Sequence, residues 1–536
     1  MPITMIATST LAFSGASTLS GATTPPNMNG NYTISTGVGT FSTAHHDYEG
    51  GVESFTLYSP PIKSRYSMVY WTMQEAVPLP ADIVARFDGK VMAVTGYEAD
   101  QVMVVDGVET SVPITWAYNH HFEHHLSGKN SVLERVAPGE AGGRHGGENW
   151  VSRPRRDDPN ASSPIPVATM FSEGNGGEYR KSWHGYASPY AQLVESPVTW
   201  SMMPMQIDTR NRDGSMAKPG DPFVPGPVPK SAQGRAPTSG ADAVYSGLLE
   251  CPCTDRIGRK VVNASAPFGD TADGVLTYEG RLMPPNPPTF SRNCAPWPTG
   301  ELLSQHNPTC DIRTYQGGLR CCPHEGFLLD TDQAVPDDVL EYRFKVRFYF
   351  QPHDARKHEP VWRWGFSGSP GSDEYDIPKC AAGTPPSECI HSIVAYVQPK
   401  DFASRSATCE STRSPWNNIN PACKPGSVGF KPVHLGGHCH APACLSMELY
   451  NDDTGELICR HVPTYGTKVA GATGDHRFDE KGYLALPPCV WGSAAQGLPE
   501  PPLLKWETRL RSVKRVNNTY AHTGEMALWQ GHGVLA

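Results

Sequence analysis

Glycine and proline interrupt this chain too often for it to be built from long helices. The sequence has 52 glycines and 51 prolines, nearly a fifth of its 536 residues. Both residue types break helices and mark turns. Aromatic residues make up 9% of the chain, which is too many for a disordered polymer. This balance predicts a folded chain of short strands joined by many turns.

Short apolar runs between the turns support this prediction. Their length and their β-branched and aromatic side chains are typical of strands. The segment EYRFKVRFYF at 341–350 alternates in the manner of a half-buried strand. The other runs are SFTLYSP, RYSMVYWTM, VMAVTGYE, DQVMVVDG and VPITWAYNHHF in the first half, and SIVAYVQ, LSMELYN, ELICRHV, KWETRLRSV and EMALWQ in the second. We therefore expect an all-β fold.

The length of the chain predicts two domains, because it exceeds what one core usually supports. We expect a flexible N-terminal segment over 1–35 and a first β-sandwich over 36–245. A cysteine-rich connecting segment over 246–335 then leads to a second β-sandwich over 336–536. The expected architecture is two antiparallel sandwiches joined by a cysteine-rich linker.

Cysteine usage predicts the compartment. The 14 cysteines form no repeated C-x-x-C pairs, which disfavours zinc modules and favours disulfides in a secreted protein. Four N-x-S/T sequons, at Asn31, Asn160, Asn263 and Asn517, are compatible with a secreted glycoprotein. The N-terminus is mildly apolar but lacks a basic start, so its role as a cleaved signal stays open.

Charge and hydropathy limit the partners. The net charge is −9, and there is no block of lysine and arginine, so we expect no nucleic-acid partner. No apolar run is long enough for a transmembrane segment. A small-molecule or peptide substrate is the expected partner, and the oligomeric state stays open.

The twenty histidines are strongly clustered, and this is the main functional signal. His120, His121, His124 and His125 lie within six residues, directly after VPITWAYN. Imidazole suits copper and zinc, whose ligands must converge on one point. The adjacent pair His120-His121 points to opposite faces of a regular strand, so it can chelate only at a strand end or a bulge. We expect such an irregularity at this pair.

A second cluster, His434, His438 and His440, directly precedes the run LSMELYN. In His438-Cys439-His440 the two-residue period places both rings on the same face of a strand, which predicts a metal site. Cys439 and Cys444 could ligate copper as thiolates, but in a secreted chain we expect them to form disulfides.

The nearest downstream soft ligand is Met526, in HTGEMALWQ. Two imidazoles and a thioether favour Cu(I), which soft ligands stabilise. A His-His pair, a single histidine, His-x-His and then Met follow one another along the chain. This order resembles the copper type II, ascorbate-dependent monooxygenases, the family of peptidylglycine α-hydroxylating monooxygenase and dopamine β-monooxygenase.

That resemblance implies two jelly-roll-like sandwiches, each with one copper ion. It assigns the first ion to His120, His121 and His184, and the second to His438, His440 and Met526. His184 lies in GGEYRKSWHGY, and His124 or His125 is an alternative third ligand of the first ion. The family lacks the long cysteine-rich insert of this chain.

The same resemblance implies a mechanism. The first copper would store and pass an electron, and the second, at His438, His440 and Met526, would be catalytic and bind O₂. A C–H bond of the substrate would then be hydroxylated with two electrons from an external reductant such as ascorbate.

A closer likeness covers about residues 50 to 530. The segments VPITWAYNHHF, SEGNGGEYRKSWHGY, SGLLECPCTDRI, GGLRCCPHEGFLLD and LEYRFKVRFYF resemble the plant and algal stress-up-regulated nodulin family, whose activity is poorly defined. A non-catalytic secreted copper-binding stress or cell-wall protein is therefore the alternative function. A zinc hydrolase with Glu123 as general base is a third reading, which the absence of an H-E-x-x-H motif disfavours.

Overall fold

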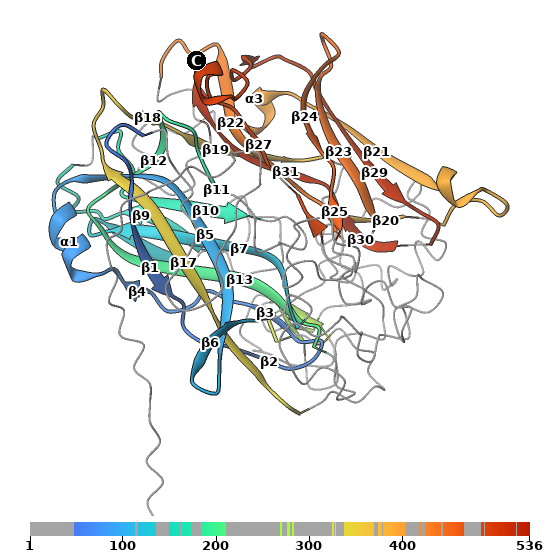
Figure 1. The fold of residues 1–536 in the computed structure, drawn as a ribbon, viewed down its shortest axis with the longest axis horizontal. Helices are drawn as coiled ribbons and strands as arrows, with labels where there is room; N and C mark the ends of the chain where they lie inside the picture. The colour runs from blue at the N-terminus through green and yellow to red at the C-terminus, as the bar shows by residue number, and fades with distance from the viewer. Residues whose placement is uncertain are drawn as a thin grey trace, which may run out of the picture.

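The computed structural model describes most of the two halves of the chain. The described residues are 48–112, 116–135, 150–160, 163–173, 184–210, 337–368, 374–403 without 378, 424–440, 443–465 and 484–536 without 487 and 521, with short pieces at 268–270, 276–278, 281–282, 324–325, 327 and 419. They form an all-β protein, which confirms the expected fold class (Figure 1). Helical turns in the described part are short: α1 (Ala81–Phe87), α3 (Pro399–Phe402), Pro386–Glu388 and Ala494–Gln496.

Two sheets pack together in the first half. The larger sheet has the order β1-β17-β5-β12-β18, with β2, β6 and β11 paired at its sides. Its strands are β1 (Glu53–Tyr58), β2 (Ile62–Ser64), β5 (Val91–Val105), β6 (Val108–Ser111), β11 (His184–Gly185), β12 (Tyr190–Glu195), β17 (Leu340–Pro352) and β18 (Glu359–Pro360). The facing sheet has the order β10-β7-β13-β3, with β4 paired to β13. Its strands are β3 (Val69–Trp71), β4 (Val77–Pro78), β7 (Ala117–Gly128), β10 (Ala168–Glu173) and β13 (Pro197–Asp208).

The predicted strand at 341–350 is the centre of β17, and its burial alternates along much of its length, as expected. Its apolar residues, among them Phe344 and Phe348, enter the core between the two sheets. On the other face Lys345 is buried as an ion pair with Glu109, at 2.7 Å. By its pairing with β1 and β5, β17 completes the first sheet. β17 follows the expected cysteine-rich segment 246–335 in the chain, so the first sheet takes strands from both sides of that segment.

The second half contains a five-stranded sheet and a four-stranded sheet. The first has the order β19-β31-β22-β27, with β28 paired to β22, and the second has the order β21-β29-β23-β24. The strands are β19 (Trp362–Ser367), β21 (Ile390–Val397), β22 (Gly429–His438), β23 (Cys444–Asn451), β24 (Glu456–His461), β27 (Cys489–Val490), β28 (Leu504–Lys505), β29 (Leu510–Asn517) and β31 (Leu528–Leu535).

Small two- and three-stranded pairings complete the described part. In the second half β20 (Glu374–Ile377) pairs with β30 (His522–Met526), and β25 (Thr464–Tyr465) pairs with β26 (Leu484–Ala485). The others are β8 (Ser131–Arg135) with β9 (Trp150–Pro154), and β14 (Phe268–Asp270), β15 (Leu276–Tyr278) and β16 (Arg281–Leu282) in one small sheet.

One apolar core runs from the first half into the second. Tyr118 of β7 and Met205 of β13 belong to the same buried cluster as Trp364, Met447 and Trp529 of the second half. Figure 1 shows the corresponding arrangement, with β7 and β13 on the side of the first half that faces the red and orange strands. The two halves are therefore joined by packing as well as by the chain.

Disulfides occur in the second half, as the cysteine content predicts. The described residues include the pairs Cys380–Cys389, Cys439–Cys444 and Cys459–Cys489. The expected flexible segment 1–35 lies outside the described residues, as does most of the cysteine-rich segment 246–335. Among the described residues, no helix is long and apolar enough to cross a membrane.

The buried Lys345–Glu109 pair generates a stability prediction. Lys345→Met leaves the Glu109 carboxylate buried without its counter-ion, and we expect the free energy of unfolding to fall by about 3–5 kcal/mol. The double variant Lys345→Met/Glu109→Gln removes both charges and should recover most of this loss. Urea unfolding at neutral pH measures both. Equal losses in the single and double variants would show that the two charges do not act as a pair.

Candidate metal centre

Three imidazoles from opposite halves of the protein meet at one point. His120 comes from β7, while His438 and His440 come from the end of β22 and the residues that follow it. The Nε2 atom of His440 lies 2.9 Å from Nε2 of His120 and 2.9 Å from Nε2 of His438. The three side chains are at most 2% exposed. We call this group the histidine centre.

A strand irregularity positions His120. Along β7, Met205 of β13 is opposite His121 and Gln206 is opposite Asn119, so the register shifts at His120. This is the bulge that the adjacent histidine pair requires. It aims the two rings differently: His120 enters the histidine centre, whereas the ring of His121 packs edge-on against Trp71, with centroids 5.3 Å apart.

A small disulfide-closed loop positions His440. Strand β22 ends at His438, and Cys439 forms a disulfide with Cys444, as the sequence predicts. Within this loop the amide of Cys444 donates a hydrogen bond to the carbonyl of His440, at 3.3 Å. The covalent closure limits the freedom of the loop, so the His440 ring stays beside His438. Their ring centroids are 4.9 Å apart.

Nε2 of His440 lies within hydrogen-bond distance of both other nitrogens. An imidazole nitrogen carries either one proton or one lone pair, so Nε2 of His440 cannot both donate and accept. A cation between the nitrogens would use all three lone pairs at once. Metal–imidazole bonds of about 2.0–2.1 Å put the nitrogens about 3.4 Å apart, so the two separations of 2.9 Å would each lengthen by about 0.5 Å. The donor set therefore fits a metal ion.

The surroundings keep the His440 imidazole in the form that binds metals. Burial, followed by the neighbouring His120, Lys514 and His121, lowers the pKa of His440 well below its ordinary value. His440 is therefore neutral at pH 7, and a neutral imidazole is the metal-binding form.

A buried ion pair lies close to the histidine centre. Lys514 and Glu525 are fully buried, and the Lys514 ammonium contacts the Glu525 carboxylate at 2.8 Å. The other carboxylate oxygen of Glu525, Oε1, is buried without a hydrogen-bond partner among the described residues. The pair is so close that the positive charge of Lys514 helps to lower the pKa of His440. The centre thus lies in a water-poor region with fixed charges, where electrostatic interactions are strong.

The structure places His184 and His124 elsewhere in the first half. His184, on β11, is stacked on Tyr97 with ring centroids 4.6 Å apart. His124 packs edge-on against the same tyrosine, and its Nδ1 accepts a hydrogen bond from the indole of Trp200, at 2.9 Å. Both rings are thus part of an aromatic core beside β5. Among the described histidines, cysteines and carboxylates, the group that meets His120 consists of His438 and His440.

His434 and Met526 are two further buried residues of the second half of the chain. His434 lies opposite His532 across β22 and β31, near Tyr186 rather than in the centre. Met526 ends β30, two residues before Leu528, which is the cross-strand partner of His438. Its carbonyl accepts a short hydrogen bond from Lys514. One member of the first predicted ligand set, His120, and two of the second, His438 and His440, therefore lie together in one centre.

Sequence reasoning missed two features of this region. The first is the burial of Lys514, which was missed because nothing in the sequence of a polar strand indicates that a single lysine is buried. The second is a group of Cys459, His461 and Cys489, whose ligand atoms all lie within 4.8 Å of one another. The spacing Cys-x-His in ELICRHV is the same two-residue period as in His-x-His, and it could have revealed this group.

Searches with family models and among curated proteins find no match to this chain. The fold and the site define the class of molecule: an all-β protein with disulfides and with buried histidine and cysteine groups that could hold a metal ion.

The buried histidines of β7 generate a prediction about pH. Burial, and then Arg363, lower the pKa of His125 to about 4. Burial also lowers the pKa of His124 well below its ordinary value. The unfolded chain takes up these protons near pH 6.5 and the folded chain does not, so stability falls as the pH drops from 7 to 5. For His125 alone the loss at pH 5 is about 2 kcal/mol.

The variant His125→Gln tests this linkage. It should flatten the dependence of the free energy of unfolding on pH between 7 and 5, whatever its effect at pH 7. Denaturant unfolding of the wild type and the variant across this range gives the two slopes. The same slope in both proteins would contradict the prediction.

Proposed function

We propose that the protein is a copper-dependent monooxygenase whose copper is held by His120, His438 and His440. The convergence of three buried Nε2 atoms from both halves is the observation that carries this proposal. Neutral imidazole is a preferred ligand of copper. The disulfides of the second half are compatible with secretion, which we propose as the location of the protein.

Each part of the chain has a defined role in this proposal. The bulge in β7 presents His120, and the Cys439–Cys444 loop presents His440 beside His438. The three imidazoles are buried beside the shared core, whose Tyr118 packs edge-on against His120, so little water reaches them. A bound copper ion would supply the one-electron redox chemistry needed to use O₂ with a reductant such as ascorbate. We further propose, from the resemblance, that the buried Met526 contributes a soft ligand to this copper.

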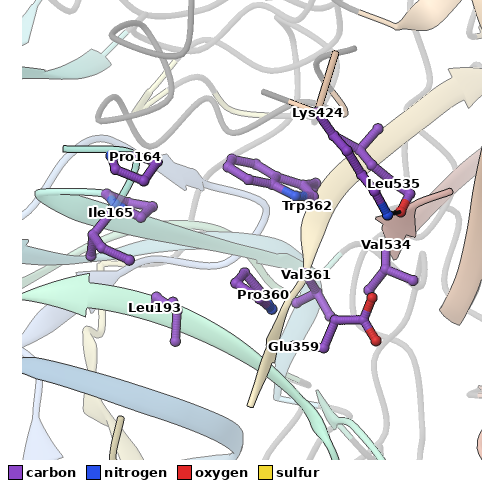
Figure 2. A pocket seen from close by; sticks show the side chains of 11 residues that line it. Pro164, Ile165, Leu193, Glu359, Pro360, Val361, Trp362, Lys424, Val534 and Leu535 are labelled. Carbon is purple, nitrogen blue, oxygen red and sulfur yellow. Dashed lines mark hydrogen bonds between the residues drawn. The ribbon is translucent and has the colours of Figure 1, made fainter. Parts of the chain in front are cut away.

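Burial of the centre favours a second candidate, a non-catalytic copper-binding protein of the secreted stress or cell-wall type. A pocket of about 290 Å³ lies between Leu193 of β12, Trp362 of β19 and Val534 of β31 (Figure 2). Val534 is opposite Lys431 on β22, seven residues before His438. At about 3.3 Å per residue, this puts the pocket about 23 Å along β22 from His438. It therefore does not lead a substrate to the three imidazoles.

Copper content distinguishes one shared centre from two separate sites. We expect about one type II copper per chain, bound by His120, His438 and His440 together. The single variants His120→Ala and His438→Ala should then each lose the same ion, whereas His184→Ala should retain it. Metal analysis with electron paramagnetic resonance on purified protein measures this.

Other patterns of metal content would contradict the shared centre. If wild type holds two coppers, and His120→Ala and His438→Ala each lose a different one, the shared centre is wrong and the two-site arrangement is right. Zinc as the bound metal, or copper unaffected by either variant, would rule out both arrangements. Circular dichroism of each variant confirms that the β fold is intact.

Activity separates the two candidate functions. A monooxygenase should consume O₂ in an ascorbate-dependent manner in the presence of a suitable small-molecule or peptide substrate, and His438→Ala should abolish this consumption while the chain stays folded. The matched control is His434→Ala, which changes a buried histidine of the same strand outside the centre. Copper binding without ascorbate-dependent O₂ consumption over a broad panel of substrates would favour the non-catalytic protein.

A further inference from the structure

A second group of metal-binding side chains lies in the second half, apart from the histidine centre. Cys459 and His461 come from β24, and Cys489 comes from β27. One ligand atom of each lies within 4.8 Å of the others. In this structure Cys459 and Cys489 form a disulfide, and Nε2 of His461 is 3.1 Å from Sγ of Cys459. No residue of this group belongs to the histidine centre.

Strand geometry explains why the three side chains meet. Cys459 and His461 are two residues apart on β24, so both point to the same face of the strand. Both are buried, whereas Arg460 between them is exposed. Cys489 faces them from β27 and is half-buried, so one end of the disulfide is accessible from solvent.

A thioether lies beside this group. Met447 is the cross-strand partner of His461 and is fully buried. A Cβ atom placed on Gly437 would meet Sδ of Met447 at 3.0 Å and Cδ2 of His461 at 3.5 Å, so the thioether and the imidazole share one small space. The neighbourhood therefore offers two sulfurs, one imidazole and one thioether, which is a soft donor set.

We propose that Cys459, His461 and Cys489 form a redox-gated site for a thiophilic metal ion, Zn²⁺ or Cu⁺. The disulfide form, as seen here, does not offer thiolates. A dithiol reductant would cleave the Cys459–Cys489 bond, giving two thiols in the protein and a disulfide in the reductant. A metal ion then binds both sulfurs and His461, and the two thiol protons are released to solvent. Met447 is placed to supply a further soft ligand.

The chain contains a matched control disulfide. Cys380–Cys389 is also a disulfide of the second half, but the contact of the Cys389 sulfur is the carbonyl oxygen of Thr384 rather than an imidazole. Among the described residues, this pair is not part of a metal-binding group. Reduction of this pair should therefore create thiols without creating the same site.

The test uses the full chain and Co²⁺ as the probe for a Zn²⁺-like ion. The protein is reduced with a dithiol, freed of the reductant under argon, and titrated with Co²⁺. We expect about one equivalent of Co²⁺ with sulfur-to-cobalt charge-transfer absorption, displaced by Zn²⁺. Reduction also frees Cys439 and Cys444 beside the histidine centre, so the variants described next, rather than the absorption alone, assign the signal to one site. In a parallel titration with Cu⁺, competition with a coloured Cu⁺ chelator shows which ion the site prefers.

Variants identify the residues that give rise to the sulfur-to-cobalt absorption. Cys459→Ser/Cys489→Ser should remove it, His461→Ala and His461→Gln should weaken Co²⁺ binding by at least about tenfold, and Cys380→Ser/Cys389→Ser should leave it unchanged. Near-ultraviolet circular dichroism checks that each reduced protein is folded.

Three results would overturn the proposal: absorption that persists without Cys459 and Cys489, no absorption in reduced and folded wild type, or unfolding of wild type on reduction before any ion binds. Loss of copper in His120→Ala with the cobalt–sulfur band intact would separate this site from the histidine centre.

Discussion

The packing of β7 against the end of β22 is the contact on which the rest of the structure depends. Tyr118 on β7 and Trp529 on β31 belong to one buried cluster, so the two halves share a core. Burial of large aromatic side chains contributes about 1.5–3 kcal/mol each. This driving force offsets the cost of removing three imidazoles from water at the same place. Without the shared core, His120 would stay in one half, and His438 and His440 in the other.

Desolvation then determines the chemistry of the region. In a buried site, the neutral form of imidazole is favoured over the charged form, which explains the low pKa of His440. The same environment makes the charges of Lys514 and Glu525 effective over longer distances, because little water is present to screen them. A metal ion at the histidine centre would therefore experience a field that the protein has arranged in advance, close to where the ion would bind.

Sulfur and imidazole are combined in two different ways in the second half. At Cys439–Cys444 the disulfide closes a loop and thereby holds His440 in position, so its role is to restrain the backbone. At Cys459–Cys489 an imidazole touches the disulfide itself, so the sulfurs and His461 can act on the same ligand. The difference arises from strand position: Cys439 alternates with two histidines in His-Cys-His, whereas Cys459 shares a face with His461.

The sequence by itself determined the all-β class, most of the strands, the occurrence of disulfides and the histidines of the candidate site, because these follow from local composition and two-residue periodicity. It also indicated that His120 and His121 require a bulge, which β7 contains. Only the tertiary structure decided that β17 completes the first sheet and that His120 meets His440, 320 residues away, while His184 stacks on Tyr97. The physical reason is that local patterns specify which face of a strand a side chain occupies. Which strand lies opposite that face depends on the packing of the whole core.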